Sequence, residues 1–212
     1  MGLALALAAA GGVFSFVPAP HVVAGPVVAV PGPLPPARPI PLPLDPAHAV
    51  VYQRGYEPGP GRSVLVERWL MAGTAFRERV TVDGRLLSDH SDGREVDYLK
   101  REWRAAPGGR LDDNCSRPRP EIDAGLANGT MTVSGPGVPV GGNETTVVRH
   151  HGTPVVDLWV SATTHRAVRC RVDMPGAVTF DLVWLPATEA NLAQLVAVIP
   201  DGFVKVAVTD RS

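Results

Sequence analysis

The sequence predicts a mainly β protein: a curled antiparallel sheet, or open half-barrel, with a short C-terminal helix against its concave face. Three observations lead to this prediction. The 212 residues include 22 Gly and 22 Pro, a turn-rich composition that is unusual for a helical protein. Most segments between the turns alternate apolar and polar residues, as half-buried strands do. The last such segment is followed by one short helical stretch and a final strand.

The chain divides into three zones. Residues 1–17 are apolar and uncharged, which predicts an export signal, a membrane anchor or the remnant of one. Residues 18–48 form a Pro-rich linker, expected to be extended because proline removes backbone donors. Residues 49–212 are the folded domain. The alternatives are a buried helix in the first zone and recognition of the linker by a proline-binding module.

The folded domain has the pattern of consecutive antiparallel strands separated by turns. Asp83-Gly84 is the strongest tight-turn signal. Residues 105–128 are rich in Pro, Gly and Asp and predict an irregular insertion with a helical turn. The expected strands lie within residues 63–71, 75–82, 85–90, 94–103, 130–133, 144–150, 154–160, 166–172, 178–184 and 204–208.

The C-terminal helix is expected within residues 187–195. Thr188 is placed to cap its start, because a threonine oxygen accepts hydrogen bonds from the first turn. Leu192, Leu195 and Val196 form its apolar stripe. One helix cannot cover a flat sheet of this size, but it can close the mouth of a curled one.

Three motifs in the second half of the domain carry a resemblance to a known family. A D-x-W-V strand, a T-x-x-P-V-R turn and strand, and a W-L-P-x-T-x-x-N-L-A-x-L helix are matched by Asp157, Trp159 and Val160; by Thr164, Val168 and Arg169; and by Trp184, Leu185, Pro186, Thr188, Asn191, Leu192, Ala193 and Leu195. In these motifs and over most of residues 50–210, the chain resembles exported actinobacterial proteins with a LolA/RseB-like fold. Ala167 replaces the proline of the second motif, and the chain lacks a lipobox cysteine. The resemblance implies an open barrel whose concave surface holds acyl chains or a peptide.

The predicted ligand surface consists of apolar side chains expected on one face of the curled sheet, beneath the C-terminal helix: Phe76, Val80, Val96, Tyr98, Leu158, Val160, Phe180, Leu182, Trp184, Leu192 and Leu195. If the sheet curls widely, a cavity remains in which a lipid or lipoprotein acyl chain gains about 0.8 kcal/mol for each buried CH₂. If the side chains fill that space, they are core. The alternative function is therefore an envelope-sensing or protein-interaction module with a filled core and no small ligand.

The two cysteines predict a disulfide. Cys115 lies in the irregular insertion and Cys170 on a strand, and disulfides are common in exported chains. The alternative is a buried Cys170 thiol, because Cys170 alternates with Val168 and Val172.

No catalytic activity and no cofactor are expected. The sequence contains no phosphate loop, G-x-S-x-G, H-E-x-x-H or C-x-x-C motif. His150 and His151 point to opposite sides of a strand and cannot bind one metal ion together. With a net charge of −1, nothing suggests a nucleic-acid partner held by bulk charge, and none is expected. The expected partners are a lipid or lipoprotein, the membrane through the N-terminal segment, and an envelope protein. The expected location is extracytoplasmic, either secreted or anchored to the cell membrane.

Overall fold

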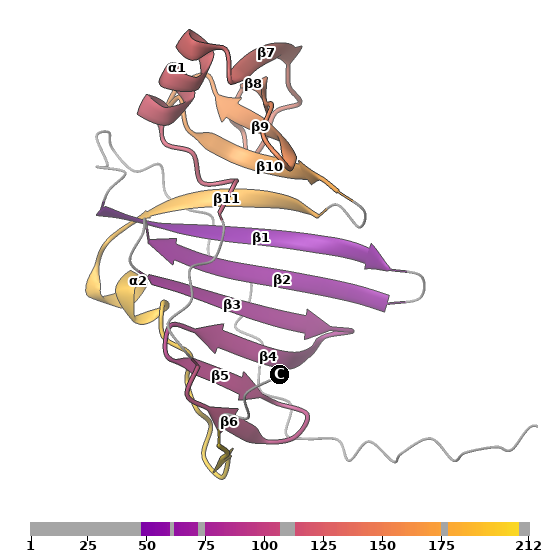
Figure 1. The fold of residues 1–212 in the computed structure, drawn as a ribbon, viewed down its shortest axis with the longest axis vertical. Coiled ribbons are helices and arrows are strands. Elements are labelled where there is room, and N and C mark those ends of the chain that lie inside the picture. The colour runs from indigo at the N-terminus through magenta and orange to yellow at the C-terminus, as the bar shows by residue number, and fades with distance from the viewer. Residues whose placement is uncertain (1–47, 60–61, 72–74, 107–112, 175–177, 208–212) are drawn as a thin grey trace, which may run out of the picture.

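The structure is a computed structural model that describes residues 48–59, 62–71, 75–106, 113–174 and 178–207. The predicted signal or anchor and the linker, apart from His48, lie outside the described residues. In the part that is described, twelve strands form one sheet in the spatial order β12-β6-β5-β4-β3-β2-β1-β11-β10-β9-β8-β7 (Figure 1). The strands at the two ends of this order do not pair with each other, so the sheet is open.

The strands are β1 (Ala49–Gly59), β2 (Arg62–Met71), β3 (Ala75–Val82), β4 (Arg85–Ser91), β5 (Arg94–Asp97), β6 (Glu102–Arg104), β7 (Met131–Pro136), β8 (Thr145–His150), β9 (Val155–Ser161), β10 (Ala167–Asp173), β11 (Thr179–Pro186) and β12 (Val204–Lys205); the helices are α1 (Arg119–Asn128) and α2 (Glu189–Ala193). Neighbouring strands are antiparallel except β12 and β6, which are parallel. The predicted fold class, a mainly β open sheet with a short C-terminal helix, is confirmed.

Two meanders meet at the centre of the sheet. The first runs from β1 to β6 and the second from β7 to β11. They are joined by antiparallel pairing of β1 with β11, from Ala49 opposite Pro186 to Tyr56 opposite Thr179. The turn predicted at Asp83-Gly84 joins β3 to β4, and both of its residues have positive φ, 49° and 77°. Glycine adopts this backbone region without a steric penalty, which explains the Asp-Gly pair.

One face of the sheet carries the main apolar core and is termed the disulfide face. Side chains from β1 and from β7 to β11 pack there against α1 and the segment that precedes it. The buried members are Val51, Cys115, Ile122, Met131, Val148, Val156, Leu158, Val160, Ala167, Cys170, Phe180 and Leu182. Gly55 on β1 has no room for a side chain, since an added Cβ would lie 2.7 Å from the Phe180 ring. The ring therefore packs directly on the backbone of β1.

The segment before α1 is fastened to the disulfide face by a covalent bond and a hydrogen-bond network. Cys115 and Cys170 form a disulfide, with their Cα atoms 5.6 Å apart. Gln53 on β1 donates from Nε2 to Asp113 Oδ1 at 2.9 Å and to Ser116 Oγ at 3.0 Å. Asp113 Oδ1 also accepts from the backbone N–H groups of Cys115 and Ser116. In the residues that the structure describes, the predicted irregular insertion therefore covers the disulfide face and is fastened to it.

The opposite face of the sheet is termed the C-terminal face, because the end of the chain covers it. Val50, Tyr52 and Trp69 form a second buried cluster there with Leu195. Residues 187–207, termed the C-terminal strap, begin with α2, continue through Leu195 and end beyond β12. Thr188 caps α2 as predicted, since its side chain accepts a hydrogen bond from the Asn191 backbone N–H.

Removing the disulfide is expected to destabilise the domain. The bond closes a loop between residues 55 positions apart. For a loop of this length the chain-entropy model gives about 4 kcal/mol, and measured values are typically about 2–4 kcal/mol. The Cys115→Ala/Cys170→Ala double variant should lose this amount of unfolding free energy in urea denaturation. A reducing agent should lower the stability of the wild type similarly and leave the double variant unchanged. Two free thiols in the denatured, non-reduced wild type would contradict the bond.

Candidate interaction surface

The predicted ligand residues are divided between the two faces of the sheet. Seven of them lie on the disulfide face, according to cluster membership and strand register: Phe76, Val80, Leu158, Val160, Phe180, Leu182 and Trp184. Val96 and Leu195 lie on the C-terminal face, and Tyr98 packs its ring against Phe203 of the strap. Leu192 is 37% exposed.

The expectation that Leu192 and Leu195 lie across the other predicted residues is therefore wrong. Phe180, Leu182 and Trp184 point to the disulfide face, whereas Val183 and Leu185 point to the C-terminal face. Successive residues of a strand alternate between faces, and the chain that leaves β11 returns along the Val183 and Leu185 side. This choice of side depends on the path after Pro186, which strand periodicity does not specify.

The disulfide face is filled by the protein itself over its β8–β11 half. Leu158 is fully buried, and the disulfide and Ile122 of α1 belong to the same cluster. The Trp184 indole Nε1 donates to the Ala167 backbone oxygen at 2.8 Å, which satisfies its polar atom within this core. These side chains are therefore core in the described structure.

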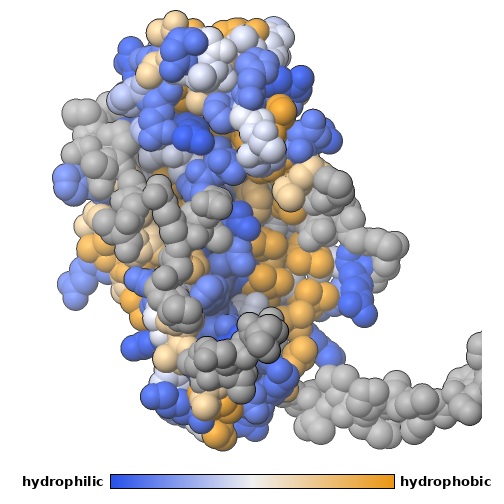
Figure 2. Space-filling model, viewed as in Figure 1, coloured by the Kyte–Doolittle hydropathy of each residue, from blue (hydrophilic) through white to orange (hydrophobic). Residues whose placement is uncertain are grey.

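Among the described residues, the disulfide face is less covered over β2 and β3. Val64 lies opposite Val82, and Val66 lies opposite Val80, so the four valines form a compact block. All four are half-buried. Figure 2 shows an apolar area over the ends of β1 to β3, beside charged surface. Within the described ranges, this block is a half-buried apolar surface.

The C-terminal face carries a buried charged cluster. Asp89 is fully buried and accepts two hydrogen bonds from Arg77, at 2.7 Å from Nε and 2.6 Å from Nη2. Arg79 is 9% exposed, and its Nε lies 4.0 Å from Asp89 Oδ2 without a hydrogen bond. The Arg77 guanidinium also lies over the Trp69 ring, 5.3 Å from its centroid. Bidentate and cation–π contacts together hold the Arg77 side chain in one orientation.

Two tyrosines extend this cluster. Tyr52 donates from its hydroxyl to Glu67 Oε1 at 2.6 Å. Burial raises the pKa of the Tyr52 phenol above its ordinary value, and the hydrogen bond to Glu67 raises it further. Burial also raises the pKa of Tyr98, and the negative charge of Asp89 adds to this effect. Both phenols are therefore neutral at physiological pH and act as hydrogen-bonding or packing groups.

The C-terminal strap is held on this face largely through its backbone. Arg77 Nη1 donates to the Gln194 carbonyl at 3.2 Å, and Arg94 Nη1 donates to the Ala197 carbonyl at 3.3 Å. The Ala197 N–H donates to Ser91 Oγ at 3.0 Å. Leu195 and Ala197 are buried, whereas α2 has no buried residue. In the described residues, this cover is held by main-chain hydrogen bonds and two buried apolar side chains.

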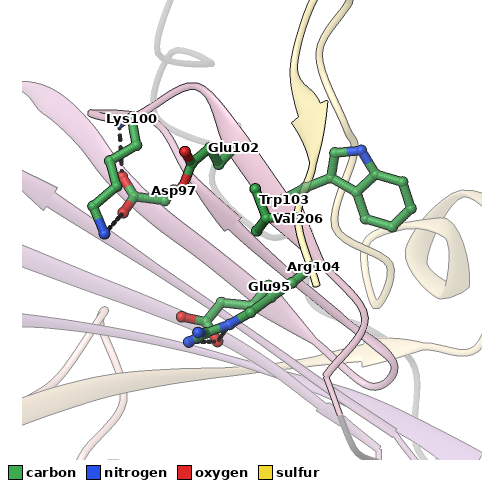
Figure 3. A pocket seen from close by; sticks show the side chains of 7 residues that line it. All are labelled: Glu95, Asp97, Lys100, Glu102, Trp103, Arg104 and Val206. Atoms are coloured by element: carbon green, nitrogen blue, oxygen red, sulfur yellow. Dashed lines mark hydrogen bonds and ion pairs between the residues drawn. The ribbon is translucent and has the colours of Figure 1, made fainter. Parts of the chain in front are cut away.

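A small pocket of about 90 Å³ lies beside β5, β6 and the end of the strap (Figure 3). Its lining residues are Glu95, Asp97, Lys100, Glu102, Trp103, Arg104 and Val206. Asp97 pairs with Lys100 at 3.3 Å, and Glu95 pairs with Arg104. Figure 3 shows the Trp103 indole directed away from these charges, where Lys205 lies over its ring. The pocket is smaller and more polar than a site for a drug-sized apolar ligand, for which about 300–1,000 Å³ is usual.

Sequence periodicity did not identify the buried charges. The alternation in β3 assigns Arg77 and Arg79 to a solvent face, but the strap covers that face. Asp89, an acidic residue of the neighbouring strand β4, could have been recognised as a partner for these arginines. Nothing in the sequence shows, however, that the two strands place these charges under a cover. In the described ranges, no group of three or more His, Cys, Asp or Glu side chains is placed to hold a metal ion. The same ranges contain no helix with the length and apolarity needed to cross a membrane.

The Asp89 carboxylate is expected to be essential for stability. Asp89→Asn would leave Arg77 and Arg79 buried without a counter-charge, which costs about 3–5 kcal/mol in comparable buried pairs. Asp181→Asn is the matched control, because Asp181 forms a similar two-point contact with Arg169 on the surface. Loss of this surface ion pair should lower the unfolding free energy by less than about 1 kcal/mol. Equal midpoint shifts for both variants in urea denaturation would contradict this ranking.

The sequence matches no protein-family model and no curated protein. Among solved structures, the chain is similar to an uncharacterized conserved protein from Thermus thermophilus, with a TM-score of 0.41 and 13% identity over 76% of this chain and 91% of that chain. It is also similar to a chain in the complex of Pseudomonas aeruginosa MucA/MucB, with a TM-score of 0.35 and 18% identity over 71% of this chain and 56% of that chain. At these values, neither similarity assigns an activity, a ligand or a partner, and the family resemblance of the sequence remains a prediction.

Proposed function

We propose that this chain is a non-catalytic protein-interaction domain that acts outside the cytoplasm. The observation that carries the proposal is the filled core. The seven predicted ligand residues on the disulfide face lie on the same side of the sheet as α1 and the segment bearing the disulfide, and five of them belong to that buried cluster or pack against it. Where the chain already covers the apolar face, over β8–β11, the sheet offers surfaces to other proteins more readily than a cavity to a lipid.

The disulfide supports the proposed location. Structural disulfides persist in oxidising compartments and are rare in the cytosol of most organisms. Cys115 and Cys170 are both buried, so the bond acts as a structural link. The apolar residues 1–17 agree with export, since their composition resembles a signal or anchor segment.

Binding of a hydrophobic ligand is the second candidate function. The block of Val64, Val66, Val80 and Val82 favours it, because an acyl chain could lie along this half-buried strip. Each CH₂ removed from water contributes about 0.8 kcal/mol. Against this candidate, the small pocket beside β5 and β6 is lined mainly by charged groups.

The two candidates make opposite predictions for lipid binding. The folded wild type should show no saturable binding in displacement assays with a fluorescent fatty acid across several lipid classes. Protein purified without detergent should release no stoichiometric lipid on solvent extraction. One-to-one binding that is weakened by Val80→Trp and unchanged by Leu126→Trp, an exposed site on α1, would reject the interaction proposal in favour of a lipid carrier.

A further inference from the structure

We infer that the C-terminal strap occupies, in cis, a peptide-binding groove on the C-terminal face. The inference rests on the proposed interaction function and names the surface that performs it. The groove would accept a peptide segment of a partner protein that forms the same turn and carries an aliphatic residue followed, two positions later, by a small residue. The strap itself presents this pattern as Leu195-Val196-Ala197.

The groove recognises main-chain groups. Arg77 and Arg94 donate to the carbonyls of Gln194 and Ala197, and Ser91 accepts from the Ala197 N–H. None of these three contacts involves a side chain of the strap. A different segment with the same backbone path could therefore make all of them, because main-chain hydrogen bonds supply affinity without selecting side chains.

Side-chain selection is confined to two positions. Leu195 is buried against Val50, Tyr52 and Trp69, and Ala197 is fully buried. Val196 and Val198 between and beyond them are 47% and 64% exposed. The main chain here is a turn that continues α2: the Leu195 N–H donates to the Leu192 carbonyl and the Val196 N–H to the Ala193 carbonyl, and Ala197 follows this turn. The two buried side chains define the aliphatic-x-small pattern expected in a partner.

The recognising groups are held in place independently of the strap. Asp89 fixes the Arg77 guanidinium with two hydrogen bonds, and Trp69 lies beneath it. Ser91 belongs to β4, which pairs with β3 and β5. A groove built on a continuous sheet keeps its geometry when its occupant leaves, and such preorganisation favours binding.

The strap is suited to leave because little of it is buried. In α2 no residue is buried, and β12 has two residues. Segments with few buried apolar contacts open locally at lower free energy than core strands. Strap and partner peptide would use the same donors and acceptors, so each excludes the other. A strap that is closed in about nine molecules of ten lowers the apparent affinity for the peptide about tenfold.

The test uses full-length protein and a fluorescein-labelled synthetic peptide with the sequence of residues 189–200, followed by fluorescence anisotropy. Leu195→Asp weakens only the strap, and this variant should bind the peptide at least about tenfold more tightly than the wild type. Leu192→Asp is the matched control and should bind like the wild type, because Leu192 lies outside the buried cluster. Adding Ser91→Ala and Arg94→Ala to Leu195→Asp should reduce binding severalfold. A peptide with aspartate in place of the leucine that corresponds to Leu195 should not bind.

Two further measurements keep the test decisive if Leu195→Asp misfolds. They are the peptide affinity of the Leu195→Ala variant and amide hydrogen exchange of the wild type. In the wild type, the Ala197 amide should exchange faster than amides of β1 and β2, and added peptide should not slow the exchange of those strands. Exchange of Ala197 at the same rate as β1 would overturn the inference, because the strap would then open only with global unfolding. Equal peptide affinity of the wild type and both folded Leu195 variants would also overturn it. Either result, with no lipid binding, leaves the interaction proposal standing, whereas lipid binding removes both.

Discussion

The pairing of β1 with β11 is the interaction on which the rest of the structure depends. It joins two meanders, each formed by neighbours in sequence, into one sheet through contacts between residues more than a hundred positions apart. Because β1 has neighbours on both sides, its alternate side chains enter two different cores. Val51 and Gln53 point to the disulfide face, and Val50 and Tyr52 to the C-terminal face. A single open sheet of this kind must be covered on both sides, and each cover comes from another part of the chain.

The two covers differ in chemistry. The segment before α1 is joined to β10 by a disulfide, and a glutamine of β1 is hydrogen-bonded to it. The C-terminal strap is held by hydrogen bonds to its backbone and by two buried side chains. A covalent link restricts one cover in every state of the oxidised protein. The other cover is limited only by the local free energy of a few contacts, so the two faces have different capacities to be exposed.

The charged cluster explains how a polar face is tolerated beneath a cover. Asp89 is fully buried, and its negative charge is balanced by Arg77 and Arg79. Buried ion pairs contribute little net stability compared with well-packed apolar residues, but removing one partner is costly. The C-terminal face therefore combines paired charges with the apolar cluster of Val50, Tyr52, Trp69 and Leu195 under one cover.

The sequence by itself determined most of the strands, the tight turn at Asp83-Gly84, the cap at Thr188 and the open, mainly β class, because each depends on local periodicity or on backbone preferences of a few neighbouring residues. It did not predict β1, and it placed residues 94–103 in one strand where the structure has β5 and β6. Only the tertiary structure decided which side of the sheet each cover takes. Strand alternation places Phe180 and Val183 on opposite faces but does not say where the chain goes after Pro186. Strand alternation therefore did not predict that Leu195 packs on the other face of the sheet from most of the predicted ligand residues, or that Arg77 is buried. These outcomes depend on contacts between segments distant in sequence, and a period of two carries no information about which distant segment covers a face.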